Sequence, residues 1–117
     1  MTAIEDVKER LIMTVYKKKF AESKTREYYV TTNYKFYSMS KRTKAYKEIK
    51  PFFRKDRNCV CIRVNSIPQQ CKNIVAKAFI KGTNNHDIVR QINGDVFDFS
   101  IGNLEVIPVD WNRSEEE

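Results

Sequence analysis

The spacing of the apolar residues changes twice along this chain, and the two changes limit the folds that it can adopt. Residues 1–24 carry apolar side chains at steps of three and four, which predicts an N-terminal amphipathic helix. Residues 28–66 hold short aromatic and β-branched runs between polar turns, which predicts a small antiparallel sheet. Helical spacing returns at residues 70–80. We therefore expect an α+β fold, and a length of 117 residues indicates a single domain.

The predicted sheet is divided by turns that contain polar and charged residues. The expected strands are 28–31, 34–38, 46–53 and 59–65. Residues 40–45 contain no apolar side chain larger than alanine, which indicates an exposed and basic loop tip. Pro51 lacks an amide hydrogen, so the third of these strands is expected at the edge of the sheet.

The positive charge of the chain is concentrated in one segment. The net charge is +7, and residues 35–57 alone hold nine Lys or Arg against two Asp or Glu, which is also a balance of +7. Aromatic residues are interleaved with these cations, a combination typical of surfaces that bind nucleic acid. The candidate binding residues are Lys35, Lys41, Arg42, Lys44, Lys47, Lys50, Arg54, Lys55, Arg57, Tyr37 and Tyr46. An acidic protein surface is the alternative partner, and simple solubility is the explanation that needs no partner.

Cysteine usage and hydropathy indicate the compartment. Three cysteines, an odd number, are too few for the disulfide framework of a secreted protein. No segment approaches the ~18 apolar residues of a membrane span, so we expect a cytoplasmic protein without a membrane partner. A zinc site can be drawn from Cys59, Cys61, Cys71 and His86. However, C-x-C on a strand lacks the turn that aims two sulfurs at one ion, and buried apolar cysteines are the preferred interpretation.

Five segments occur in an order and at a spacing that a known family shares. They are Val30-Thr31-Thr32-Asn33-Tyr34-Lys35-Phe36-Tyr37-Ser38-Met39, Glu48-Ile49-Lys50-Pro51-Phe52, Ile74-Val75-Ala76-Lys77-Ala78-Phe79-Ile80, Val89-Arg90-Gln91-Ile92-Asn93-Gly94-Asp95 and Gly102-Asn103-Leu104-Glu105-Val106-Ile107. Over residues 28–112 the chain resembles the HNH homing endonucleases of phages and introns. The resemblance implies a basic β module at 28–66 and an HNH-like half at 70–112, in which 88–92 and 104–107 pair as a ribbon. It also implies a bacterial host cell as the location.

The residues that carry the family's chemistry are replaced at three positions. The resemblance places the general-base histidine on Gln91, an adjacent metal ligand on Arg90, and a further histidine on Lys72. An amide cannot accept a proton from water near neutral pH, and a guanidinium repels a divalent cation. A family asparagine that binds metal corresponds to Asn112, a vestigial candidate ligand. We therefore expect a catalytically silent protein without a cofactor, and a divalent metal only if nuclease activity persists.

Three functions agree with these features. The preferred one is a nucleic-acid binding protein, with double-stranded DNA as its partner, derived from an HNH homing endonuclease. The second is a small phage-type inhibitor that binds an acidic surface of a host defence or regulatory protein. The third is an active nickase in which His86 replaces the lost base. The family's glycine in the first β-turn falls on Tyr34, which predicts a turn of different geometry.

Overall fold

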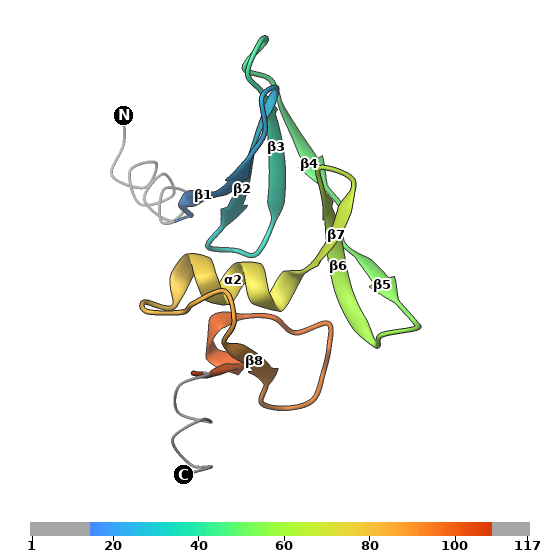
Figure 1. Ribbon diagram of the computed structural model, residues 1–117, viewed down its shortest axis with the longest axis vertical. Helices are drawn as coiled ribbons and strands as arrows, with labels where there is room; N and C mark the ends of the chain where they lie inside the picture. The colour runs from blue at the N-terminus through green and yellow to red at the C-terminus, as the bar shows by residue number, and fades with distance from the viewer. Residues whose placement is uncertain (1–14, 109–117) are drawn as a thin grey trace, which may run out of the picture. The chain divides into compact units, whose positions relative to one another are not determined.

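The computed structural model describes residues 15–108, which form mainly antiparallel β-sheet and one short α-helix (Figure 1). The chain divides after Glu48 into two compact units. The fold class is thus mixed α+β with a predominance of strands. None of the helices in residues 15–108 is long and apolar enough to cross a membrane.

The first unit contains a four-stranded sheet with the order β1-β2-β3-β4. Its strands are β1 (Lys17–Glu22), β2 (Arg26–Thr31), β3 (Phe36–Ser40) and β4 (Tyr46–Ile49). Strands β1 and β3 pair with β2 in antiparallel register, and Tyr29 lies opposite Tyr37. Alternation along β2 and β3 gives the sheet two faces. Val30 and Phe36 are fully buried on one face, whereas Tyr29 and Tyr37 are half-buried on the other.

The helix predicted within residues 1–24 is wrong for its second part, because Lys17–Glu22 is strand β1. Residues 1–14 lie outside the described residues. In the strand, the ring of Phe20 packs against Phe36 edge to face at 6.4 Å between centroids and against Tyr28 at 6.3 Å. These contacts and the pairing with β2 outweigh a local helical spacing, which is a weak preference.

The connection between β2 and β3 also differs from the expectation. Tyr34 adopts the left-handed backbone conformation, with φ of 66°, which a glycine adopts without strain. Its amide donates to the carbonyl oxygen of Thr31 at 2.9 Å, and the Thr31 amide donates to the carbonyl oxygen of Lys35 at 2.9 Å. The turn therefore keeps a geometry suited to glycine, although a tyrosine occupies the position.

The second unit combines a three-stranded sheet, a helix and a two-stranded ribbon. Its elements are β5 (Phe52–Arg54), β6 (Cys59–Val64), β7 (Ile67–Gln70), α2 (Cys71–Phe79), β8 (Ile88–Gln91), the short 3-10 helix η1 (Ile101–Asn103) and β9 (Leu104–Ile107). Helix α2 buries Ile74, Val75 and Ala78 and contacts β6, β7, β8 and β9. The predicted helix at 70–80 and the pairing of 88–92 with 104–107 are confirmed.

The strand predicted at 46–53 is wrong, because this segment is divided between two sheets. Tyr46–Ile49 joins the first sheet, and Phe52–Arg54 begins the second sheet, with the order β5-β6-β7. Lys50 and Pro51 separate them, and Pro51 has no amide hydrogen to continue a ladder. The interval 28–66, expected to form one sheet, thus contributes to two. Strand β7 was not predicted from the sequence.

Candidate nucleic-acid interface

Two turns lie side by side at one end of the four-stranded sheet. The β1–β2 turn contains Ser23, whose hydroxyl accepts hydrogen bonds from the amides of Thr25 (3.4 Å) and Arg26 (3.2 Å). The amide of Lys41, in the β3–β4 loop, donates to the carbonyl oxygen of Thr25 at 2.9 Å. Lys44 has a left-handed φ of 62° and donates its amide to the carbonyl oxygen of Ser40 at 2.8 Å. The backbone hydrogen bond from Lys41 to Thr25 therefore joins the two turns.

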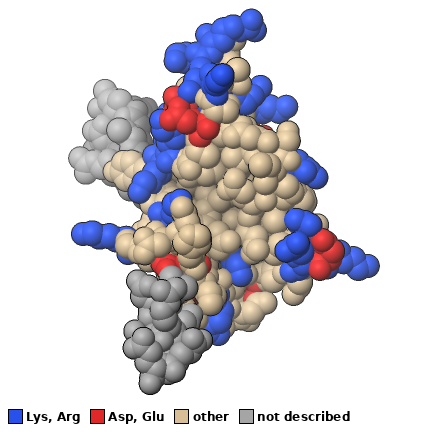
Figure 2. Space-filling model, in the orientation of Figure 1, with Lys and Arg blue, Asp and Glu red and all other residues tan. Residues whose placement is uncertain are grey.

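A cavity of about 520 Å³ lies between these turns. We call it the tip cleft, and it is lined by Lys24, Thr25, Ser40, Lys41 and Arg42. Three of these side chains are cations, and two carry hydroxyl groups. In Figure 2, Lys and Arg gather around the β3–β4 loop, which lies at the top of the view in Figures 1 and 2. A concave site with cations and hydroxyls is chemically suited to a phosphate or another anion.

Only part of the positive charge at the tip cleft is offset by a carboxylate. The Lys41 ammonium lies 2.8 Å from Glu22, which also pairs with Lys19 at 3.2 Å. Hydrogen bonds from Lys41 and Lys19 hold the pKa of Glu22 below its ordinary value of 4.5. Among the described residues, Lys24, Arg42 and Lys44 form no ion pair.

The predicted binding residues belong to two different units. Lys35 pairs with Glu48 at 3.8 Å, and Lys47 is exposed on β4, both in the first unit. The remaining predicted cations, Lys50, Arg54, Lys55 and Arg57, belong to the second unit. The basic segment 35–57 is therefore divided between two units.

The end of β5 and the turn that follows it hold three of these second-unit cations. Arg54 is bound to Asp56 by two hydrogen bonds, at 2.9 and 3.4 Å, and these bonds hold the pKa of Asp56 below its ordinary value of 3.8. Lys55 and Arg57 are exposed in the same turn. Two cations are thus left for contact with a partner at this turn.

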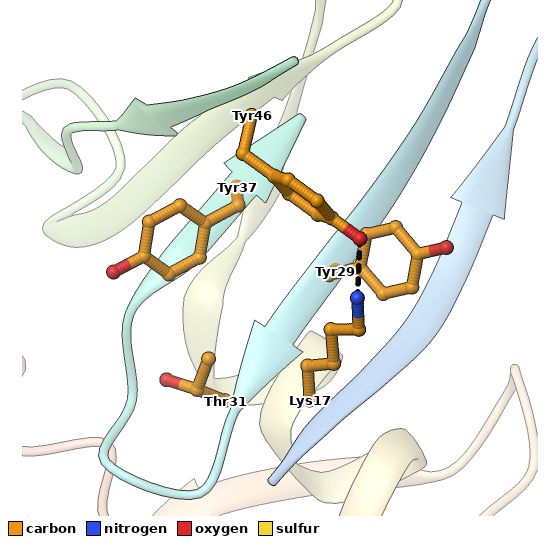
Figure 3. Close-up of a pocket in the computed structure, with 5 residues that line it drawn as sticks. All are labelled: Lys17, Tyr29, Thr31, Tyr37 and Tyr46. Atoms are coloured by element: carbon orange, nitrogen blue, oxygen red, sulfur yellow. Dashed lines mark hydrogen bonds between the residues drawn. The ribbon is translucent and has the colours of Figure 1, made fainter. Parts of the chain in front are cut away.

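Tyr37 and Tyr46 line a second cavity, of about 280 Å³, on the face of the first sheet opposite Phe36 (Figure 3). Lys17, Tyr29 and Thr31 complete its lining. Sequence reasoning missed Lys17 because it was placed in a helix, and it missed Lys24 because the turn was not recognised. The alternation of Tyr29 and Thr31 with Tyr28 and Val30 was the available signal for this face.

The positions at which the resemblance implies catalytic residues have structural roles in the second unit. Arg90 forms an ion pair with Glu105, which lies opposite it in the β8–β9 register. The Gln91 side-chain amide donates to the carbonyl oxygens of Val96 (3.0 Å) and Asp98 (3.2 Å). These bonds use the Gln91 donors to hold the loop that joins the two strands.

The divalent cation that the resemblance implies does not fit these residues. The guanidinium at position 90 supplies no oxygen ligand, and Gln91 supplies at most one neutral amide oxygen where such an ion prefers carboxylates. Lys72, in the first turn of α2, is half-buried, and His86 is exposed in the loop before β8. Asn112 lies outside the described residues. Within residues 15–108 there is no group of three or more His, Cys, Asp or Glu residues that is arranged to hold a metal ion.

The three cysteines are free and buried, as expected for small apolar residues. Cys59 and Cys61 lie 3.6 Å apart between their sulfurs. Burial raises the pKa of the Cys71 thiol to about 12 and that of Cys61 to about 11. Both groups are therefore protonated near neutral pH. A protonated thiol is a poor nucleophile and a poor metal ligand.

Comparisons of the chain with protein-family models, with curated proteins and with solved structures found no match. A functional assignment therefore rests on the residues described above.

Proposed function

We propose that this protein binds nucleic acid, with double-stranded DNA as the expected partner, and that the tip cleft makes the main contact with backbone phosphates. The observation that carries this proposal is the convergence of Lys24, Lys41 and Arg42 on one cavity, although they come from turns distant in the sequence. Phosphate contacts from Lys and Arg supply most of the affinity of non-specific nucleic-acid binding.

The charge balance at the tip cleft favours an anionic partner. Glu22 forms ion pairs with Lys19 and Lys41. In contrast, Lys24, Arg42 and Lys44 lack an acidic partner among the described residues. The positive electrostatic potential of exposed cations is not cancelled when no carboxylate lies nearby, and it attracts polyanions over a long range. The excess at this site therefore supports recruitment of a nucleic acid.

The hydroxyl groups add hydrogen-bond donors that suit phosphate oxygens. Ser40 Oγ accepts a hydrogen bond from the Thr43 amide at 3.3 Å, which leaves its own hydrogen for donation. Ser and Thr hydroxyls, with Lys and Arg, are frequent donors to phosphate oxygens. Ser40 and Thr25 can thus donate to oxygens that the cations neutralise.

We also propose that the protein has lost the nuclease activity that its family resemblance implies. The interactions of Arg90 with Glu105 and of Gln91 with the loop carbonyls support this part of the proposal. Water activation near neutral pH needs a base or a metal ion, and neither side chain supplies one.

The test measures duplex affinity as a function of salt, by fluorescence anisotropy, between about 50 and about 200 mM. The variant Lys24→Ala/Arg42→Ala removes two cations from the tip cleft. The matched control, Lys77→Ala/Lys81→Ala, removes two exposed cations from the second unit. We expect the tip variant to bind more weakly at all salt concentrations, and its slope of log affinity against log salt to fall by ~0.9 for each phosphate that is no longer neutralised.

The control must retain the affinity and slope of the unaltered protein. Equal decreases of affinity in the two variants would mean that net charge alone attracts the duplex, and the tip cleft would lose its assigned role. Undetectable duplex binding by the unaltered protein at the lowest salt would overturn the proposed function itself.

A further inference from the structure

The second cavity of the first unit, which we call the tyrosine pocket, is built from all four strands of the sheet. Its lining is Lys17 from β1, Tyr29 and Thr31 from β2, Tyr37 from β3 and Tyr46 from β4 (Figure 3). Strand pairing places Thr31 opposite Lys17 and Tyr37 opposite Tyr29, so these side chains share one face. The pocket is thus a product of the sheet register.

The rings of this pocket are held in place by neighbouring groups. The Tyr29 and Tyr46 rings lie 5.8 Å apart between centroids, with an interplanar angle of 52°. Tyr29 donates its hydroxyl hydrogen to Glu27, which raises the pKa of Tyr29 to about 12. The ring therefore remains an uncharged phenol at physiological pH.

Lys17 is the single cation of the pocket lining. Its ammonium lies 4.5 Å from the Tyr46 ring centroid and 4.9 Å from that of Tyr29, and it donates a hydrogen bond to the Tyr46 hydroxyl (Figure 3). A cationic ligand would be repelled by this ammonium, although aromatic rings otherwise attract cations. The ligand that suits the pocket is therefore a flat, uncharged ring with acceptor atoms at its edge or a phosphate attached to it.

We infer that the tyrosine pocket receives an unpaired base of a nucleic-acid strand whose phosphates contact the tip cleft. This inference rests on the proposed function and adds an unpaired base of the bound nucleic acid to the phosphates that the first unit contacts. Bases stack on tyrosine rings, and a neighbouring lysine donates to base acceptors or to the adjoining phosphate. Tyr46 is 47% exposed, so its ring is accessible to such a ligand.

The tip cleft and the tyrosine pocket lie on the same strands of the same unit. Tyr29 follows Thr25 by four residues, a distance of about 13 Å along β2, and Tyr37 precedes Ser40 by three residues on β3, a distance of about 10 Å. One strand of nucleic acid is long enough to bridge these distances. A contact at the cleft therefore brings bases of the same strand to the pocket.

The experiment separates base stacking from phosphate binding. The probes are a fluorescent oligonucleotide of about 12 thymidines and an abasic strand with the same number of phosphates. The proteins are the unaltered chain, Tyr46→Leu and Tyr37→Leu. The matched control is Tyr16→Leu, because Tyr16 is 67% exposed in the same unit and does not line the pocket.

The unaltered protein is expected to bind thymidine more tightly than the abasic strand. The thymidine affinity of each pocket variant should fall by roughly 5-fold to 100-fold. Abasic binding should be the same for all four proteins, and Tyr16→Leu should bind thymidine normally. The variant Tyr46→Phe keeps the ring and should retain most of the thymidine affinity, whereas a role of the hydroxyl alone would make it as weak as Tyr46→Leu.

Three outcomes decide the inference. Equal affinity of the unaltered protein for both probes, or thymidine affinity unchanged by Tyr46→Leu and Tyr37→Leu, would overturn the tyrosine pocket and leave the phosphate contact intact. Absence of binding to both probes would also overturn the tyrosine pocket, whereas absence of binding to duplex would overturn the proposed function itself. Weaker thymidine binding by pocket variants that keep the circular dichroism spectrum of the unaltered protein would support base recognition.

Discussion

The Lys41 ammonium and the Glu22 carboxylate form an ion pair at 2.8 Å across the two turns of the tip cleft. In the Glu22→Gln variant, Lys41 and Lys19 no longer share an acidic partner. We expect this variant to bind duplex DNA more tightly, with a salt slope steeper by ~0.9 if Lys41 neutralises one further phosphate. Anisotropy titrations at several salt concentrations measure the change, and a weaker complex would show that Glu22 orients Lys41 for binding.

The lowered pKa of Asp98 leads us to expect a less stable folded state in acid. Hydrogen bonds from the Ser100 hydroxyl and amide lower the pKa of Asp98 below its ordinary value of 3.8. A lowered pKa in the folded state stabilises the protein above the unfolded value, and this contribution is lost as the pH falls through the folded value. Melting temperatures should therefore fall below about pH 3.8 less steeply for Asp98→Asn than for the unaltered chain. Parallel pH profiles of the two proteins would contradict this assignment.

Gln91 is expected to contribute to stability through the loop that it holds. Gln91→Ala removes the donors to the carbonyl oxygens of Val96 and Asp98, at a cost of about 1 to 3 kcal/mol in the free energy of unfolding. Urea denaturation measures this change. Lys81→Ala, which alters an exposed side chain, is the control and should lie within about 0.5 kcal/mol of the unaltered protein. A Gln91→Ala protein as stable as this control would remove the structural role of Gln91.

Nuclease activity provides a separate test of the proposed function. The purified protein is expected not to nick supercoiled plasmid DNA with magnesium or manganese, because no base is available at position 91. Gel electrophoresis detects the nicked form. Nicking that disappears in Asn112→Ala or His86→Ala would restore a catalytic role to those residues and contradict the proposal.

The sequence predicts the parts of this fold that depend on local spacing. Helix α2 follows from the steps between Ile74, Val75 and Ala78, and the β8–β9 ribbon was correctly placed. Strand β1 was not predicted, since the apolar positions near Tyr16 and Phe20 also suit a helix. The packing of Phe20 on Phe36 decides between them, and it links residues far apart in the chain.

The candidate site was predicted only in part, for a related reason. The β3–β4 loop was expected to be basic and exposed, and Arg42 and Lys44 are exposed there. The β3–β4 loop lies beside Lys24 because β2 pairs with β3, and in this pairing Arg26 lies opposite Ser40. Strand register is set by long-range packing and by turn geometry, so spacing alone does not reveal the cavity.

The positions of the cysteines allow thiol labelling to detect the opening of one unit of the chain. All three thiols lie in the second unit, with exposed fractions of 8%, 2% and 0% for Cys59, Cys61 and Cys71, and residues 1–48 contain no cysteine. A thiol reagent can therefore react only after the second unit opens and exposes the cysteines. The rate of thiol labelling therefore measures the opening of the second unit. If this unit opens independently, a nucleic acid that binds only the first unit will not change the rate. If both units open in one step, the nucleic acid will slow labelling.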